Sequence, residues 1–185
     1  MKSAHDILTF WFETAGPEKW YQKSDDFDAL VRFEFEETAI VLASDISRRS
    51  SHKWEDSIDD HLALILSLDQ FPRNMFRGTK AAFAWDVFAL ASAKRLVAKN
   101  HDLKIPQDRR AFVYMPYMHS EEMIDQDRCV ALVDQRLESQ NTLHHAKEHR
   151  KVIARFGRFP HRNKIIERAS TKEEITYLNN GGYAP

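Results

Sequence analysis

Apolar residues recur at α-helical spacing along almost the whole chain, and no segment alternates as a half-buried strand would. The clearest stripe joins Phe27, Val31 and Phe35, which follow a cluster of helix-starting residues at 24–26. Glycine, proline and capping residues divide the rest of the pattern into short elements. We expect helices over residues 3–12, 24–42, 57–70, 79–100, 106 to a break or kink near 116, 120–137, 142–156 and 170–178.

Local signals set several of these expected helix ends. Ser120 is expected to cap the helix that follows it, with Glu121 in the first helical turn. Gly157 should end the helix before it. Residues 170–174 contain two overlapping capping boxes and should start the last helix. The tail, residues 179–185, should fray.

Elements of this length joined by short corners predict a single all-α domain over residues 1–185, built from seven to eight antiparallel helices. No linker or low-complexity segment divides the chain, which is long enough to bury one core. Periodicity by itself shows no repeat of about 34 residues with the aromatic and small residues of tetratricopeptide helices.

Charge and composition narrow the function classes. The 27 basic and 28 acidic residues leave a formal net charge of −1, which argues against binding to nucleic acid or to an anionic membrane. There is no glycine-rich phosphate loop, and we expect no cofactor. Cys129 is the sole cysteine, which excludes an internal disulfide and a cysteine-based zinc site. The apolar run at 7–12 is too short for a signal peptide or a membrane span, so we expect a cytoplasmic protein.

One motif occurs twice. Phe71-Pro72-Arg73-Asn74 returns as Phe159-Pro160-His161-Arg162-Asn163, and both copies have arginine and glycine nearby, in Phe76-Arg77-Gly78 and Phe156-Gly157-Arg158. Because proline cannot continue a helix, we interpret both copies as rigid corners where a helix ends. Their guanidinium and amide groups are suited to holding a carboxylate or phosphate. The alternative is that these side chains satisfy free carbonyls at helix ends.

The histidines offer further candidates. His119 follows the Pro116 break, where an imidazole could act as a general base, or could be an ordinary surface residue beside a helix cap. Ser120 lacks the Gly-x-Ser-x-Gly elbow of a nucleophilic serine. His145 and His149 have the four-residue spacing of a metal-binding pair, but no third ligand is required by spacing, and we predict no metal.

Three segments together resemble a known family: residues 68–78, 114–121 and 156–163 are similar to the bacterial family known as domain of unknown function 924. The resemblance extends from Phe10-Trp11-Phe12 to Ser170-Thr171. It implies an all-helical, tetratricopeptide-like fold, either a right-handed superhelix or a compact helical array, and it implies no activity. Glu167 stands where relatives often carry glycine.

The family motifs coincide with the polar corners, which favours one shared site. We predict that this site binds a small anionic ligand or a protein segment, and it is a candidate for enzymatic activity. Its arginines would clamp an anion, and His119 or His161 with Glu121 could move protons. The predicted site residues are Asp69, Arg73, Asn74, Arg77, His119, Glu121, Arg158, His161, Arg162 and Asn163.

Two alternatives remain beside this site. One is a tetratricopeptide-like interaction module that binds a partner protein and whose motifs only fix helix angles. The other is a purely structural role for all three motifs. Motifs that meet in one pocket favour the ligand site, motifs along an open groove favour the module, and scattered, internally paired motifs favour the structural role.

Overall fold

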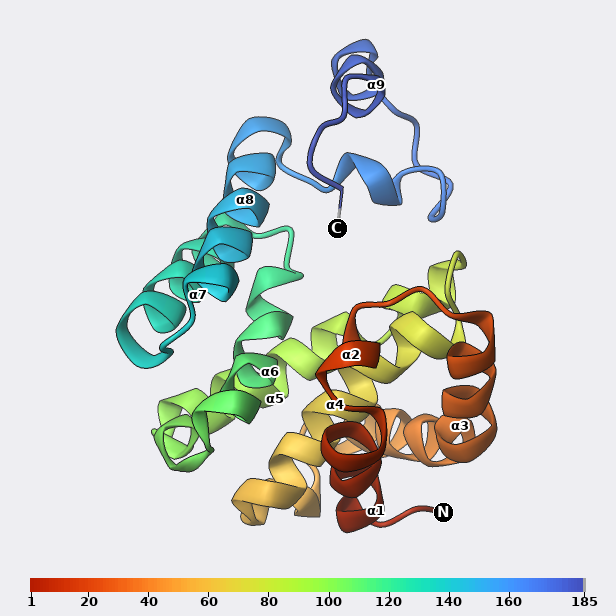
Figure 1. Cartoon of the computed structure of the whole chain (residues 1–185), viewed down its shortest axis with the longest axis vertical. Helices are drawn as coiled ribbons and strands as arrows, with labels where there is room; N and C mark the ends of the chain where they lie inside the picture. Colours follow the sequence, from red (N-terminus) through yellow and green to blue (C-terminus); the bar gives the residue numbers. More distant parts are fainter. Residues whose placement is uncertain (185) are drawn as a thin grey trace.

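The computed structural model describes residues 1–184, and over that range the chain is helical and forms no β-strand (Figure 1). Its α-helices are α1 Ala4–Thr9, α2 Pro17–Trp20, α3 Asp25–Arg49, α4 Ile58–Met75, α5 Asp86–Ala98, α6 Gln107–Met118, α7 Met123–Arg136, α8 Gln140–Phe156 and α9 Lys172–Asn179. Shorter helical segments are the π-helix η1 Phe10–Ala15 and the 3-10 helices η2 Lys53–Asp56, η3 Lys80–Phe83, η4 His101–Lys104 and η5 Pro160–Arg162. The all-α class is confirmed.

The described residues form one α-helix more than the highest expected number, eight, because the sequence did not predict the short helix α2. Gly16, with a φ of +68°, ends η1, where the sequence predicted a simple break. Pro17 then opens α2, a single turn, because its fixed φ suits the first helical position. The remaining eight α-helices correspond to the eight predicted elements.

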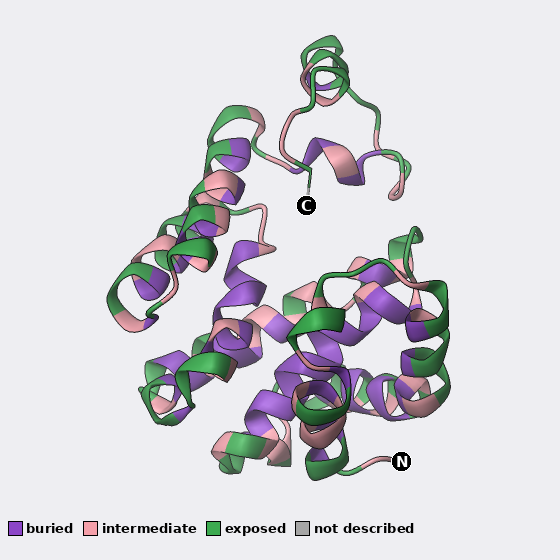
Figure 2. Ribbon diagram, viewed as in Figure 1, coloured by how far each residue is buried: buried purple, intermediate pink, exposed green. Residues whose placement is uncertain are grey.

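Helix α4 forms the centre of the molecule. Helices α1, α3, α5 and α6 all pack against it, and Figure 2 shows it almost entirely buried. The core beside it is aromatic: the ring of Trp11 lies 5.5 Å from that of Phe71 and 5.8 Å from that of Phe112. Because α4 is enclosed on nearly every side, its buried polar side chains need partners from other elements.

The C-terminal helices form a second group, at the top of Figure 1. Helix α6 links the two groups, since it packs against α4 and α5 and also against α7 and α8. Helices α7 and α8 lie against each other, and Val152, Ile153 and Phe159 form a small separate apolar cluster beside them. This arrangement brings α8 and η5 opposite the C-terminal end of α4.

The first Phe-Pro motif does not end its helix. Helix α4 continues through Phe71 and Pro72 to Met75, so the expected end at Gln70 is wrong. Proline removes the hydrogen bond to the carbonyl four residues earlier, but Phe71, Pro72 and Met75 are all buried. Their packing outweighs one lost hydrogen bond.

The second copy has a different backbone. Gly157, with a φ of +67°, ends α8 as predicted. Phe159 is then extended, and Pro160 opens η5. The expectation of two equivalent corners is therefore wrong: one motif is the last turn of an α-helix and the other starts a 3-10 helix.

Two other predicted elements also differ. Residues 79–100 do not form one helix, because η3 is followed by a turn and α5 begins only at Asp86. Helix α6 passes through Pro116 without a break and ends at Met118. A proline this close to the end costs a single hydrogen bond, which the buried end of the helix tolerates.

The helix expected from Ser120 begins at Met123, with Glu122 as its N-cap. The Ser120 hydroxyl accepts a hydrogen bond from the Glu122 N–H at 3.2 Å and donates to Asp125 at 2.9 Å. A serine that bonds the backbone two residues on forms a turn that competes with a helix start. Glu121 consequently lies outside the helix, contrary to the prediction.

The chain beyond α9 turns back towards α8. Tyr183 Oη lies 2.8 Å from Nδ1 of His145 and 3.3 Å from Nδ1 of His149. Tyr183 thus has a packed position within the tail that was expected to fray, and Pro185 lies outside the described residues. Across residues 1–184, no helix combines the length and the apolar character that crossing a bilayer requires.

Candidate functional site

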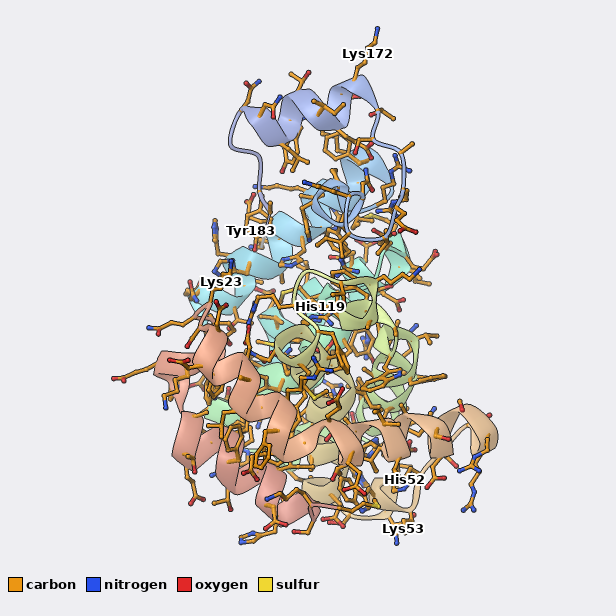
Figure 3. The ribbon with its side chains drawn as sticks, turned by 90° about the vertical axis from the view of Figure 1, so that its right-hand side faces the viewer. Lys23, His52, Lys53, His119, Lys172 and Tyr183 are labelled. Atoms are coloured by element: carbon orange, nitrogen blue, oxygen red, sulfur yellow. The ribbon has the colours of Figure 1, made fainter. Side chains whose placement is uncertain are left out.

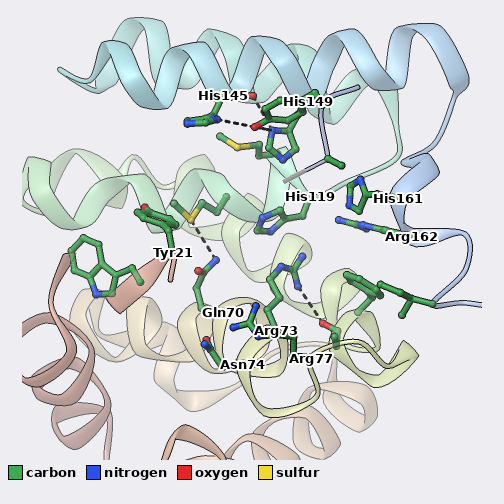
Figure 4. Close-up of a pocket in the computed structure, with 18 of the residues that line it drawn as sticks. Tyr21, Gln70, Arg73, Asn74, Arg77, His119, His145, His149, His161 and Arg162 are labelled. Atoms are coloured by element: carbon green, nitrogen blue, oxygen red, sulfur yellow. Dashed lines mark hydrogen bonds between the residues drawn. The ribbon is translucent and has the colours of Figure 1, made fainter. Parts of the chain in front are cut away.

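A cavity of about 590 Å³ lies where α8 and η5 face the end of α4 (Figure 4). Cavities of roughly 300–1,000 Å³ are typical of small-molecule sites. Six of the predicted site residues line it: Arg73, Asn74, Arg77, His119, His161 and Arg162. The first and third family motifs therefore meet here with His119, which Figure 3 shows in the interior between the two groups of helices.

His119, in the cavity wall, is paired with Asp69, which is fully buried behind it. His119 Nδ1 lies 2.8 Å from Oδ1 of Asp69, and Gln70 Nε2 donates to Oδ2 of the same carboxylate at 2.6 Å. Because a carboxylate only accepts, His119 Nδ1 carries a proton. Burial alone would raise the pKa of Asp69, but His119 and Arg73 outweigh it and lower this pKa to about 2. Asp69 is consequently ionised and fixes the orientation of the imidazole.

Arg73 and Arg162, one from each Phe-Pro motif, approach a single carboxylate. Arg73 donates two hydrogen bonds to Asp86, at 2.8 and 3.1 Å, and Arg162 Nη1 lies 3.5 Å from Asp86 Oδ2. Both guanidinium groups also lie over the Phe83 ring, at 5.7 and 4.6 Å from its centroid. Asp69 lies 3.5 Å from the other side of Arg73. Charges therefore alternate from Asp69 through Arg73 and Asp86 to Arg162.

Arg73 and Arg162 differ in how many hydrogen bonds their guanidinium groups donate. Arg73 also donates to the carbonyls of Asp69 and Ala82, at 3.0 and 3.3 Å. The Arg162 guanidinium makes a single hydrogen bond within the described residues, the long one to Asp86, and its buried Nε has no partner. Burial, together with the nearby charge of Arg73, lowers the pKa of Arg162 to about 10.

Three more histidines line the cavity: His145, the buried His149 and the half-buried His161. Burial and the neighbouring His119 lower the pKa of His149 to about 3, and burial with Arg162 lowers that of His161 to about 4. His149 Nδ1 donates to the carbonyl of His145 at 2.8 Å, whereas the buried Nδ1 of His161 has no hydrogen-bond partner among residues 1–184. Both imidazoles are neutral at neutral pH. The cavity thus combines neutral imidazoles with one under-satisfied guanidinium.

Comparison with known proteins identifies the family. The family described as "Bacterial protein of unknown function (DUF924)" matches residues 7–182. The chain belongs to this family. The chain is also similar to the solved structure of a protein of unknown function from Agrobacterium tumefaciens, with 40% sequence identity and a TM-score of 0.88, and the match covers 96% of this chain and 97% of the other. No curated protein matches the chain.

In this DUF924 member the remaining predicted residues hold the site together instead of lining it. Glu121 accepts from the Phe159 N–H at 2.7 Å and pairs with Arg168 at 2.7 and 2.9 Å. Arg158 pairs with Glu174 at 2.5 and 2.8 Å. Glu121 was expected to move protons, but both of its oxygens are engaged in these contacts. Its role here is to fix the start of η5.

Asn163 completes the same network. It donates to Ser170 at 3.1 Å and to Glu174 at 3.2 Å, and its oxygen accepts from Arg168 at 2.5 Å. Glu167, in the corner that follows, has a φ of +58°, which glycine adopts without the steric cost of a Cβ. A glycine at this position would fit the same corner.

Asn74 and Arg77 lie at the cavity but are tied to α3. Asn74 donates to Asp28 at 2.8 Å, and Arg77 donates to the same carboxylate at 2.5 and 2.8 Å. These contacts fasten the end of α4 and the following turn to α3.

Sequence reasoning missed Asp86 and Phe83, which connect the two arginines. Both fell inside the predicted helix 79–100, where nothing distinguished them from ordinary helical residues. It also missed Tyr183, which was assigned to a fraying tail. His145 and His149 were noted for their spacing, which was a usable signal, although the structure assigns them to the cavity wall. Residues 1–184 contain no group of three or more histidine, cysteine or carboxylate side chains suited to a metal ion, and the absence of a metal stays a prediction.

Proposed function

We propose that the cavity binds a small anionic molecule and that Arg162 is its principal anchor. The supporting observation is the state of this side chain, which is only 10% exposed yet uses a single N–H in one hydrogen bond of 3.5 Å. A buried guanidinium with unused N–H groups is costly to maintain. Two anionic oxygens in the cavity would satisfy its planar fork and offset that cost.

The other arginines of the predicted site do not need such a ligand. Arg73, Arg77 and Arg158 each donate two hydrogen bonds to a carboxylate of this chain. Burial lowers the pKa of Arg162. The pKa values of Arg73, Arg77 and Arg158 are instead raised by their partner carboxylates. Arg162 is therefore the arginine of the predicted site whose N–H groups can bind an anion.

The rest of the wall supports a ligand with an apolar body. Met115, Met118, Phe83 and Ile165 contribute apolar side chains beside the polar groups. Sites of this kind hold a small molecule by apolar contact and orient it through a few polar groups. The proposed ligand is thus a small molecule with an anionic group at one end.

A tetratricopeptide-like superhelix that binds a protein segment, in the cytoplasm, stays the alternative prediction. Such modules bind along extended concave surfaces. A cavity of about 590 Å³ with walls from several helices and the tail supports a small molecule instead.

Sulfate is a suitable first probe, because it is a dianion that does not titrate near neutral pH. We expect calorimetry to detect sulfate binding to the wild type and to show at least about tenfold weaker binding to Arg162→Lys, which keeps the charge but loses the fork. Arg150→Lys is the matched control, since Arg150 forms an exposed pair with Asp127 away from the cavity. Equal sulfate affinity in wild type and Arg162→Lys would contradict the proposal.

A further inference from the structure

We propose that His119, positioned by Asp69, is the acid–base group of this cavity and takes up one proton when an anion binds at Arg162. This inference rests on the proposed function and adds a chemical role to it. The ligand class that it implies is a small anion with a further oxygen or nitrogen within reach of the imidazole.

The imidazole of His119 is held by Asp69 at one of its two ring nitrogens. Nδ1 of His119 is occupied by Asp69 at 2.8 Å, which leaves Nε2 as the ring nitrogen available to a ligand. Figure 4 shows His119 at the middle of the cavity, between the arginines of the first motif and His149. A histidine whose Nδ1–H is held by a buried carboxylate presents Nε2 as a base and is stabilised once it becomes protonated.

The charged groups around His119 balance one another before a ligand enters. The charged and titratable groups around it are Asp69 and Arg73 from α4, Asp86 from α5, His149 from α8, His161 from η5 and, in the wall of the same cavity, Arg162 of η5. The two carboxylates and two guanidinium groups cancel, and the histidines are neutral. An anion that enters would leave an uncompensated negative charge in a largely buried site, which favours the uptake of a proton.

His119 is the histidine best placed to take that proton. Its ring is bonded to a carboxylate, which stabilises the imidazolium. His161 lies beside Arg162, whose charge opposes protonation. His149 donates to a neutral carbonyl, which does not stabilise a positive charge as a carboxylate does. Its ring centroid lies 6.3 Å from that of His119, so protonation of both rings would place two positive charges close together. Without a ligand, burial and Arg73 keep the pKa of His119 below its usual value, so the proton is absent at neutral pH.

The same arrangement defines what His119 could do to a ligand. For a ligand with an oxygen that gains negative charge near its anionic group, the Nε2–H of the imidazolium would donate its proton to a lone pair of that oxygen. The imidazole that remains is neutral and keeps its Nδ1–H bond to Asp69. This is general-acid chemistry that needs no metal ligand from the chain.

The experiment measures how many protons the protein takes up when sulfate binds. Sulfate binding is measured by calorimetry at pH 7.5 in two buffers of different ionisation enthalpy, which gives the protons taken up per sulfate. We expect close to one proton for the wild type, close to none for His119→Gln, and an unchanged value for the matched variants His149→Gln and His161→Gln. Asp69→Asn should lower the proton uptake, because the imidazolium loses its carboxylate.

A second measurement needs no variant. Nitrogen NMR of the wild type should show the pKa of His119 rising on addition of sulfate while Nδ1 stays protonated. Sulfate binding without proton uptake, or uptake that persists in His119→Gln, would overturn this inference and leave the anion site standing. Absence of any sulfate binding would instead overturn the proposed function and this inference together.

Discussion

Arg73 and Arg162 lie 89 positions apart in the chain, yet their guanidinium groups approach the same carboxylate, that of Asp86, at 2.8 and 3.5 Å. The sequence treats them as equivalent, because each follows a Phe-Pro pair. The structure separates them. Arg73 is held by two carbonyls and two carboxylates, whereas Arg162 keeps most of its donors for the cavity.

Arg73→Gln should act mainly on stability. The change removes the closer of the two guanidinium partners of Asp86 and the arginine partner of the buried Asp69, so we expect the free energy of unfolding to fall by about 3 kcal/mol. Urea denaturation measures it. Arg77→Gln is the control, because Arg77 is 37% exposed and its pair with Asp28 should be worth about 1 kcal/mol or less. Equal losses in the two variants would show that Arg73 is not a structural residue.

Asp86→Asn should have opposite effects on stability and on anion affinity. Both arginines lose their shared carboxylate, so the free energy of unfolding should fall. Sulfate no longer competes with that carboxylate for Arg162, so its affinity should rise, by about tenfold. Asp127→Asn, in an exposed pair with Arg150, should change neither quantity appreciably. A sulfate affinity that stays the same or falls in Asp86→Asn would count against Arg162 as the anchor.

Stability should decrease as the pH falls below about 6.5. His61, His149 and His161 have pKa values lowered to about 4, 3 and 4, chiefly by burial. The unfolded chain binds protons at its ordinary histidine pKa, near 6.5, while the folded protein does not, so acid favours unfolding. Each histidine should cost about 1–2 kcal/mol between pH 7 and 5.

Urea denaturation at several pH values measures this loss. His61→Gln should reduce the pH dependence, because the imidazole that must stay neutral is removed. His5→Gln, at an exposed position on α1, is the control and should leave the dependence unchanged. A stability that is constant from pH 7 to 5 would mean that these histidines are protonated in the folded state.

Glu167→Gly should raise stability slightly. Glu167 is exposed, its backbone has a φ of +58°, and its one ion pair, with Lys80, is long at 3.9 Å. Glycine removes the steric cost of this conformation, so we expect a gain of about 1 kcal/mol or less in thermal unfolding. Glu167→Ala keeps the Cβ and should show no gain. A loss in the glycine variant would mean that chain entropy outweighs the relief of strain.

Local signals predicted several helix ends correctly. The capping box of Thr171 and Glu174 starts α9, and Gly157 ends α8 in a left-handed conformation. These signals work because the residues involved act on their own backbone. They failed at Pro72, where burial of the helix end outweighs the hydrogen bond that proline removes.

The sequence by itself determined the helical class, the family and the residue types of the site. Helical spacing of apolar residues, caps and paired Phe-Pro motifs are all encoded over short distances along the chain. Only the tertiary structure decided the roles of the site residues. Whether an arginine is free or paired depends on carboxylates such as Asp86 and Glu174, which packing brings from distant elements. The sequence lists donors and acceptors, but the fold decides which of them meet.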